Sequence, residues 1–225
     1  MSQDPYRRVA GWYDTLFQSM NAALISIGLK MFPPTEAMSI LDVGCGTGAQ
    51  LARYQPAGCA LYGIDTSPAM LAVAQKQLGS AADLRLESAT AMPFDDQTFD
   101  LITSTLVLHE MAPATRDEVL AEMQRVLKPN GRLLLIDFHP GPYRFPKGWF
   151  TKAFITVSER MAGRDHYRHY RHFMGAQGLP NLIGKHKLQI DQQKIVSGGN
   201  MAVLLVQTQQ VWTDKSVNIP LAATV

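Results

Sequence analysis

The sequence predicts an α/β protein built on one doubly wound sheet of about seven strands, mostly parallel, with helices on both faces. Three observations support this prediction. Short runs rich in valine, isoleucine and leucine alternate with helical patterns at the spacing of β-α-β units. A glycine-rich segment, residues 44–48, follows the first of these runs. Near the C-terminus, residues 197–200 (Ser-Gly-Gly-Asn) separate two strand-like runs, which predicts an antiparallel hairpin.

The elements can be justified in chain order from their residues. Residues 5–31 place apolar side chains near helical spacing and stop before Pro33-Pro34, which predicts one or two amphipathic helices. The next helix-like segments are expected at 49–55, 67–79 and 114–131, the second with Ser67 as its N-cap and the last closed by a Pro-Asn-Gly turn. Five buried strands are expected in the apolar runs 39–44, 59–65, 84–88, 99–105 and 132–138.

The segment 139–187 interrupts this alternation with two expected helices, 151–163 and 165–178. Two strand-like runs follow it and complete the sheet as the hairpin. The sequence therefore divides into four parts: an N-terminal helical flap at 1–35, a core at 36–138, a helical cap at 139–187, and the C-terminal hairpin with its tail at 188–225.

Composition excludes several classes of protein. With 225 residues and 46% hydrophobic residues, the chain suits one globular domain, and no apolar run approaches the roughly 18 residues that span a membrane. The N-terminal residues do not resemble a signal peptide. Cys45 and Cys59 have neither metal-ligand spacing nor enough company for a disulfide framework, so we expect a cytoplasmic protein.

Charge is divided unevenly along the chain. Residues 36–137 hold seven Lys/Arg and thirteen Asp/Glu, a balance of −6, whereas residues 138–187 hold nine and two, a balance of +7. The basic segment could attract anionic ligands, nucleic acid or lipid headgroups, or it could simply be a solvated face. Its aromatic residues around Trp149 favour either a lid over a lipid-like ligand, with peripheral contact to membrane lipid, or burial on the sheet.

The glycine-rich segment has the composition of a nucleoside-binding loop. Gly44, Gly46 and Gly48 would let the backbone turn tightly and approach a ligand closely. Asp65 ends the next predicted strand, where a carboxylate can accept the hydroxyls of a ribose. The glycines alone also fit a nicotinamide dinucleotide. Asp42 favours a ligand with a cationic amino and sulfonium end, because a carboxylate there would repel a pyrophosphate.

Four ordered motifs resemble the class I S-adenosylmethionine-dependent methyltransferases. They read ILDVGCGTG (40–48), LYGIDTSPAML (61–71), ESATAMPFDDQTFDLITS (87–104) and VLKPNGRLLLIDF (126–138). Within that class the chain is most similar to the ubiquinone/menaquinone-biosynthesis-type group with a type 11 methyltransferase domain, and Tyr6-x-x-Val9-Ala10-x-x-Tyr13-Asp14 shares this likeness. The resemblance, which covers residues 6–138, implies a Rossmann-like fold, bound S-adenosylmethionine and methyl transfer.

The resemblance also implies roles for individual residues. Gly44, Gly46 and Gly48 would line the methionine portion of the cofactor and Asp65 would hold the ribose. Tyr13 and, less directly, Tyr6 would belong to a flap over it. The residues expected near the adenine are Thr66, Met70, Ser88 and Ala89. Ser88 stands where related loops usually carry aspartate, so backbone contacts at Ala89 would have to replace a carboxylate.

Candidate catalytic residues lie where the later strands end. His109 follows the fourth strand, His139 follows the fifth, and either could take a proton from an acceptor or be structural. Tyr170 belongs to a segment, 165–173, in which histidine recurs every third residue. That segment could line an acceptor pocket or pack as a polar helix. No carboxylate at compatible spacing accompanies its histidines, so no metal site is expected.

The sequence thus predicts methyl transfer to a small-molecule acceptor that is apolar or anionic, for example a quinone precursor. Alternatives are a phospholipid N-methyltransferase at a membrane surface, an NAD(P)-dependent oxidoreductase, and a cofactor-binding protein without catalysis. A nucleic-acid partner is not expected, because no Asn-Pro-Pro-Tyr-like tetrapeptide follows the fourth strand and no RNA-binding appendage is present. The oligomeric state and the accepting atom are not determined by the sequence.

Overall fold

The computed structural model describes the backbone of residues 10–208 and the side chains of residues 20–208. Tyr6 and the tail after residue 208 lie outside the described residues, as does the side chain of Tyr13. The predictions made for the two tyrosines therefore stay predictions.

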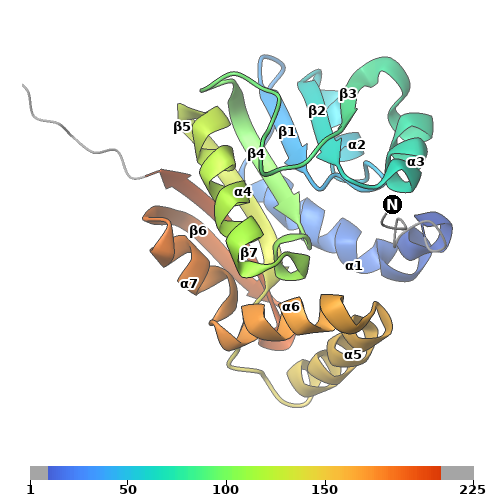
Figure 1. Cartoon of the computed structure of the whole chain (residues 1–225), viewed down its shortest axis with the longest axis vertical. Coiled ribbons are helices and arrows are strands. Elements are labelled where there is room, and N and C mark those ends of the chain that lie inside the picture. Colours follow the sequence, from blue (N-terminus) through green and yellow to red (C-terminus); the bar gives the residue numbers. More distant parts are fainter. Residues whose placement is uncertain (1–9, 209–225) are drawn as a thin grey trace, which may run out of the picture.

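Seven strands form one twisted sheet in the order β3-β2-β1-β4-β5-β7-β6 (Figure 1). The first five strands run parallel to one another, whereas β7 lies antiparallel between β5 and β6. This arrangement confirms the predicted doubly wound sheet with an antiparallel C-terminal hairpin. The strands are β1 (Ser39–Val43), β2 (Ala60–Asp65), β3 (Ala82–Leu86), β4 (Phe99–Thr105), β5 (Leu127–Phe138), β6 (Leu188–Val196) and β7 (Met201–Thr208).

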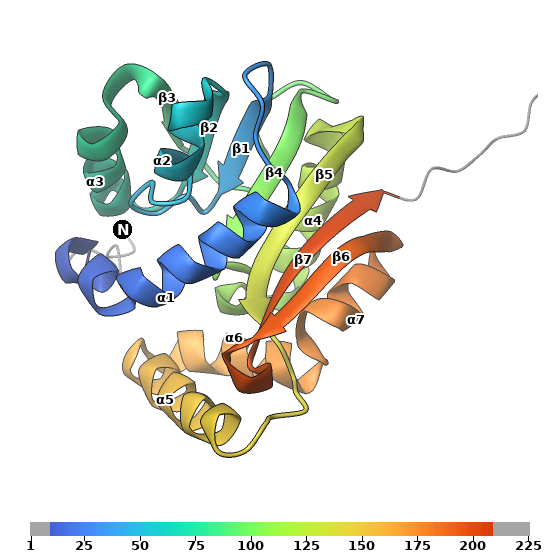
Figure 2. The ribbon, with the colours of Figure 1, turned by 180° about the vertical axis from the view of Figure 1, so that it is seen from behind.

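Helices cover both faces of this sheet, as predicted (Figures 1 and 2). One face carries α1 (Ala10–Met31), α2 (Leu51–Tyr54) and α3 (Pro68–Leu78), and the other carries α4 (Pro113–Val126) and α7 (Gly178–Lys185). Two further helices, α5 (Lys147–Met161) and α6 (Arg164–Gly175), lie beyond the carboxyl ends of β4 and β5. These two helices therefore stand at the edge of the sheet where ligands of such folds bind.

The core is the middle of the sheet. Leu133, Leu134 and Leu135 of β5 are completely buried, and β7 is buried along most of its length because helices cover both of its faces. The edge strand β6 instead exposes most of its residues. Ser67 caps α3 as predicted, its hydroxyl accepting a hydrogen bond from the N–H of Met70 at 3.2 Å.

Three details differ from the sequence prediction. The helix after the glycine-rich segment has only four α-helical residues before a 3₁₀ turn. Helix α4 ends at Val126, and β5 begins at once, so the Pro-Asn-Gly sequence lies inside a strand that shifts register between Phe99 and Leu101 of its partner. Segment 139–187 holds a third helix, α7, whose Leu179 and Ile183 are buried. Within the described residues, no helix is long and apolar enough to cross a membrane.

Candidate functional site

A cavity of about 350 Å³ opens at the carboxyl ends of β1, β2 and β4. Its walls come from the loops after these strands, from α1 and from the start of α4. The structure brings eight of the predicted cofactor residues together here: Asp42, Gly44, Gly46, Asp65, Thr66, Met70, Ser88 and Ala89. The sheet topology explains this convergence, because parallel strands end at the same edge.

The glycine-rich segment turns back from β1 over the end of β2. The N–H groups of Gly44 and Cys45 both donate to the carbonyl of Ile64, at 2.9 and 3.0 Å. Gly44 has a φ of +70°, and an added Cβ would lie 2.6 Å from the side chain of Val107, so only glycine fits there. Gly46 has a φ of +52° and open space where a Cβ would point, which leaves room for a ligand.

Gly48 is placed differently from the prediction. It is not among the residues that line the cavity. A Cβ at Gly48 would lie 2.8 Å from Leu78 and 3.2 Å from Ala74, both on α3. Its φ of +82° also requires glycine. The structure therefore gives Gly48 a packing role between the loop and α3 rather than a ligand contact.

The carboxylate of Asp65 is oriented by two backbone groups. Its Oδ2 accepts a hydrogen bond from the N–H of Gly46 and its Oδ1 accepts one from the N–H of Ser67, each at 2.8 Å. These bonds fix an acidic side chain at the mouth of β2, facing the cavity. A carboxylate has about four acceptor positions, so capacity remains for the hydroxyls of a ribose.

Asp42 is a buried carboxyl group in the cavity wall. It is 2% exposed and its Oδ1 accepts a hydrogen bond from Thr103 Oγ1 at 2.6 Å. Burial raises its pKa from 3.8 to about 7; the Thr103 hydrogen bond lowers the pKa, and the negative charge of Asp65 raises it. A cation in the cavity would favour the ionised form, which fits the cationic amino and sulfonium end expected beside Asp42.

Two polar side chains in the cavity wall were missed by the sequence reasoning. Asn21 Oδ1 and Gln50 Nε2 are buried and have no hydrogen-bond partner among the described residues. Buried groups of this kind are normally paired, so both positions suit a polar ligand. Asn21 lies on α1, which confirms that this helix reaches the cavity. Neither residue stands in a recognisable motif, so nothing in the sequence alone indicated them.

The loop after β3 supplies the remaining predicted contacts. Ser88 and Thr90 are hydrogen-bonded to each other through their hydroxyls at 2.9 Å, and both line the cavity together with Ala89. The position usually held by aspartate is therefore a hydroxyl pair, which can donate to or accept from a base edge but carries no charge.

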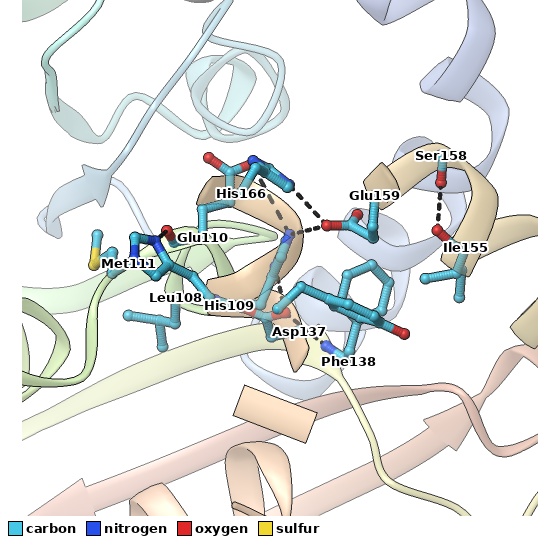
Figure 3. Close-up of polar contacts among 12 residues, drawn as sticks. Leu108, His109, Glu110, Met111, Asp137, Phe138, Ile155, Ser158, Glu159 and His166 are labelled. Atoms are coloured by element: carbon cyan, nitrogen blue, oxygen red, sulfur yellow. Dashed lines mark hydrogen bonds and ion pairs between the residues drawn. The ribbon is translucent and has the colours of Figure 1, made fainter. Parts of the chain in front are cut away.

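His109 does not line this cavity. It lies in a 3₁₀ turn, η3 (Leu108–Glu110), and its ring is 3% exposed (Figure 3). Its Nδ1 lies 2.8 Å from Asp137 Oδ1, and its backbone N–H donates to Asp137 Oδ2 at 3.1 Å. Burial alone would lower its pKa, but the Asp137 carboxylate outweighs burial and raises the pKa to about 9. A histidine that holds its proton at neutral pH and faces away from the cavity is not placed to deprotonate an acceptor.

The other two candidate catalytic residues also lie outside the cavity wall. The backbone N–H of His139 donates to the carbonyl of Asn200 at 2.8 Å, and its ring packs by Gly199 and Gly141, which fixes the loop after β5. Tyr170 is 3% exposed, and Lys152 Nζ donates to its hydroxyl at 3.4 Å. It faces a separate hollow between α5 and α6. The structure thus brings the cofactor residues together and leaves the catalytic candidates apart from them.

Comparison with known proteins assigns the family. The family model described as a methyltransferase domain matches residues 41–135. The chain is 34% identical over 183 residues to an uncharacterized methyltransferase of Synechocystis, covering 80% of this chain and 77% of that protein. It is also 34% identical over 163 residues to a demethylmenaquinone methyltransferase of Tropheryma whipplei, covering 70% and 66%. With a ubiquinone/menaquinone biosynthesis C-methyltransferase of Geobacter sulfurreducens the identity is 34% over 137 residues, covering 57% of this chain and only 53% of the relative.

Solved structures agree on the fold. A methyltransferase from Aquifex aeolicus that depends on S-adenosylmethionine superposes with a TM-score of 0.54 at 20% identity, covering 81% of this chain and 88% of that one. A Pyrococcus horikoshii protein superposes with a TM-score of 0.60 at 16% identity, covering 88% and 91%. These matches support a methyl donor, and none supports a nicotinamide cofactor or a phospholipid acceptor. The chain belongs to the class I S-adenosylmethionine-dependent methyltransferases of the ubiquinone/menaquinone-biosynthesis type.

Proposed function

We propose that S-adenosylmethionine binds in the cavity with its methionine portion over Gly44 and Gly46 and its ribose on Asp65. The adenine then lies against Met70 and the Ser88–Thr90 loop, and the cationic end faces Asp42. The observation that carries this proposal is the pair of carboxylates on opposite sides of the glycine turn, one buried and one fixed by backbone N–H groups. Together they match a ligand with a cation at one end and a ribose at the other.

The acceptor proposed here is a small apolar aromatic compound that resembles a quinone precursor. Two relatives carry names that describe menaquinone or ubiquinone biosynthesis. The cavity wall after β4 fits such a ring, since Leu106, Val107, Met111 and Val119 present apolar side chains. We place the reaction in the cytoplasm, which accords with two buried cysteines that form no disulfide.

The chemistry needs little from the chain beyond alignment. The bound cofactor supplies a methyl group on a positively charged sulfur, and transfer breaks that carbon–sulfur bond as the bond to the acceptor forms and the acceptor loses a proton. The glycine turn fixes the donor, and the apolar wall after β4 holds the acceptor and excludes water. Helix α1, whose Asn21 and Ile25 line the cavity, would act as the flap.

We also propose that α5 contacts membrane lipid, from which an apolar acceptor would be drawn. One side of this helix leaves large apolar side chains in solvent, which is uncommon for a surface that has no partner. Basic residues lie among and beside them, including Lys147 and Arg160 (Figure 2). The exposed apolar side chains are Phe145, Trp149, Phe150, Phe154, Val157 and Met161.

One assay tests the acceptor and one tests the surface. Purified protein is incubated with S-adenosylmethionine and, separately, demethylmenaquinol, simple hydroxylated aromatics and phosphatidylethanolamine, and the methylated products are measured by mass spectrometry. Methylation of an aromatic acceptor is expected. Turnover with phosphatidylethanolamine alone would contradict the proposal, as would none with any aromatic. Co-sedimentation with anionic vesicles should fall when Phe150 and Phe154 are changed to serine, and unchanged pelleting would contradict the lipid contact.

A further inference from the structure

A second constellation of chemically active side chains lies outside the cofactor cavity, where η3 meets the cap helices (Figure 3). His109 comes from η3, Glu159 from α5 and His166 from α6. One ligand atom of each, Nε2, Oε2 and Nε2 respectively, lies within 4.8 Å of the other two. These residues are far apart in the sequence, so only the tertiary structure joins them.

The distances suit a small metal ion. Glu159 Oε2 is 3.6 Å from His109 Nε2 and 2.7 Å from His166 Nε2. Nitrogen and oxygen ligands around a tetrahedral Zn²⁺, each about 2.0–2.1 Å from the ion, are about 3.3 Å from one another. The observed separations bracket that value. Glu110 Oε1 lies 3.9 Å from His109 Nε2 and 4.0 Å from His166 Nε2, on the cavity side of the cluster.

The cluster is buried, and one of its carboxylate oxygens lacks a hydrogen bond. The side chains of His109 and Glu159 are 3% and 10% exposed. Among the described residues nothing donates a hydrogen bond to Glu159 Oε2: His166 Nε2 is close, but its N–H does not point at that oxygen. An oxygen of this kind is costly to bury unless a cation or a donor faces it.

The far side of His109 is arranged as metal-bound histidines usually are. Asp137 is 1% exposed; its Oδ1 lies 2.8 Å from His109 Nδ1 and also accepts from the N–H of Phe138 at 2.7 Å. A carboxylate on Nδ1 fixes the ring and turns Nε2 toward the other two ligands. Such a second carboxylate typically orients the imidazole and increases its basicity toward a metal.

We propose that His109, Glu159 and His166 bind a divalent transition-metal ion, best matched by Zn²⁺, with Glu110 completing the ligand set. Two imidazoles and carboxylates are a donor set that Zn²⁺ accepts readily and that Mg²⁺, which prefers oxygen ligands alone, does not. The ion would join η3 to α5 and α6 and so fix the cap over the carboxyl ends of β4 and β5. This inference does not rest on the identity of the methyl acceptor.

Metal binding to the whole chain tests the proposal directly. Tag-free protein is stripped with a chelator and titrated with Zn²⁺ by calorimetry, and Mg²⁺ serves as the control ion. One Zn²⁺ per chain and a raised melting temperature are expected, with no effect of Mg²⁺. Substituting Co²⁺ should give the visible absorption of a four-coordinate ion. Stripped, folded protein that binds no Zn²⁺ would overturn the proposal.

Variants locate the ion. Glu159→Gln and His166→Asn should each weaken Zn²⁺ binding at least tenfold, and Asp137→Asn should weaken it by about 10- to 100-fold. His172→Ala is the matched control, because His172 lies on the same helix but is exposed, and it should bind as the wild type does. Circular dichroism confirms that each variant is folded. If the wild-type stoichiometry and affinity persist in both ligand variants, the ion binds elsewhere and the proposal fails.

Discussion

Replacing Asp42 with asparagine separates the stability of the fold from its affinity for the cofactor. Asparagine has almost the same shape as aspartate, and its carbonyl oxygen can still accept the hydrogen bond that Thr103 donates at 2.6 Å. The substitution therefore removes a buried charge and little else. We expect Asp42→Asn to stabilise the cofactor-free protein and to weaken its binding of S-adenosylmethionine.

The magnitude follows from the pKa. Burial raises the pKa of Asp42 from its ordinary 3.8 to about 7. A difference of about three pK units corresponds to about 4 kcal/mol of free energy that the folded state loses when this group is ionised. Water entering the cavity screens part of that cost, so about 4 kcal/mol is an upper limit. In a chain of this size each 1 kcal/mol moves the melting temperature by about 2–4 °C.

The sign of the pH dependence is fixed by the direction of the shift. The cost of the buried charge is fully present above pH 7, decreases as the pH falls through the folded pKa, and disappears below about 3.8. The stability gained by Asp42→Asn should accordingly be largest at pH 8 and smaller at pH 5.5. Equilibrium urea denaturation of both proteins at the two pH values measures this difference.

Cofactor binding should change in the opposite direction. Losing an ionic hydrogen bond typically costs about 1.5–3 kcal/mol, which is about a 10- to 100-fold increase in Kd. Wild-type affinity should also strengthen as the pH rises toward 7, whereas the affinity of Asp42→Asn should stay level. Calorimetry with S-adenosylmethionine at both pH values checks this. An affinity that the substitution leaves unchanged would refute the placement of the cationic end at Asp42.

Asp100 provides the matched control. Burial alone would raise its pKa, but hydrogen bonds from Lys128 and the N–H of Ser39 outweigh burial and hold the pKa below its usual range. Asp100→Asn should therefore lower stability at pH 8, lose that effect in acid, and leave cofactor affinity unchanged. If Asp42→Asn also lowers stability at pH 8, the desolvation argument for Asp42 is wrong.

Three further substitutions test the site and its supports. Gly44→Ala should destabilise the fold by about 1–3 kcal/mol, because its φ is +70° and the new Cβ would meet Val107 at 2.6 Å; a wild-type urea midpoint would contradict this. Asp65→Ala should raise the Kd for S-adenosylhomocysteine at least tenfold, as calorimetry can show, and an unaltered Kd would remove Asp65 from the ribose site. Arg116→Met should cost about 1–3 kcal/mol in urea denaturation, because the buried guanidinium donates to two carbonyls of the turn before α4, and unchanged stability would mean that water replaces it.

Local pattern was sufficient for most of the fold. The strands are short and buried, and their composition records that burial, so β1, β2, β4 and β5 could be located from the sequence. Ser67 could be identified as a helix cap because a cap bonds within its own turn. The Pro-Asn-Gly sequence after α4 was misassigned to a turn, since its place in β5 depends on pairing with β4, which is distant in the sequence.

The sequence by itself determined where the cofactor would lie, because Asp42, the glycine turn and Asp65 each end a strand, and parallel strands bring their ends to one edge. It did not determine the direction of a side chain at such an end. Only the tertiary structure showed that His109 faces Asp137 and the cap rather than the cavity. The histidine repeat had no carboxylate within its own helix, and packing of α5 against α6 supplied Glu159. Contacts between distant elements depend on how helices pack, and a periodic pattern specifies which face is buried but not which side chain it meets.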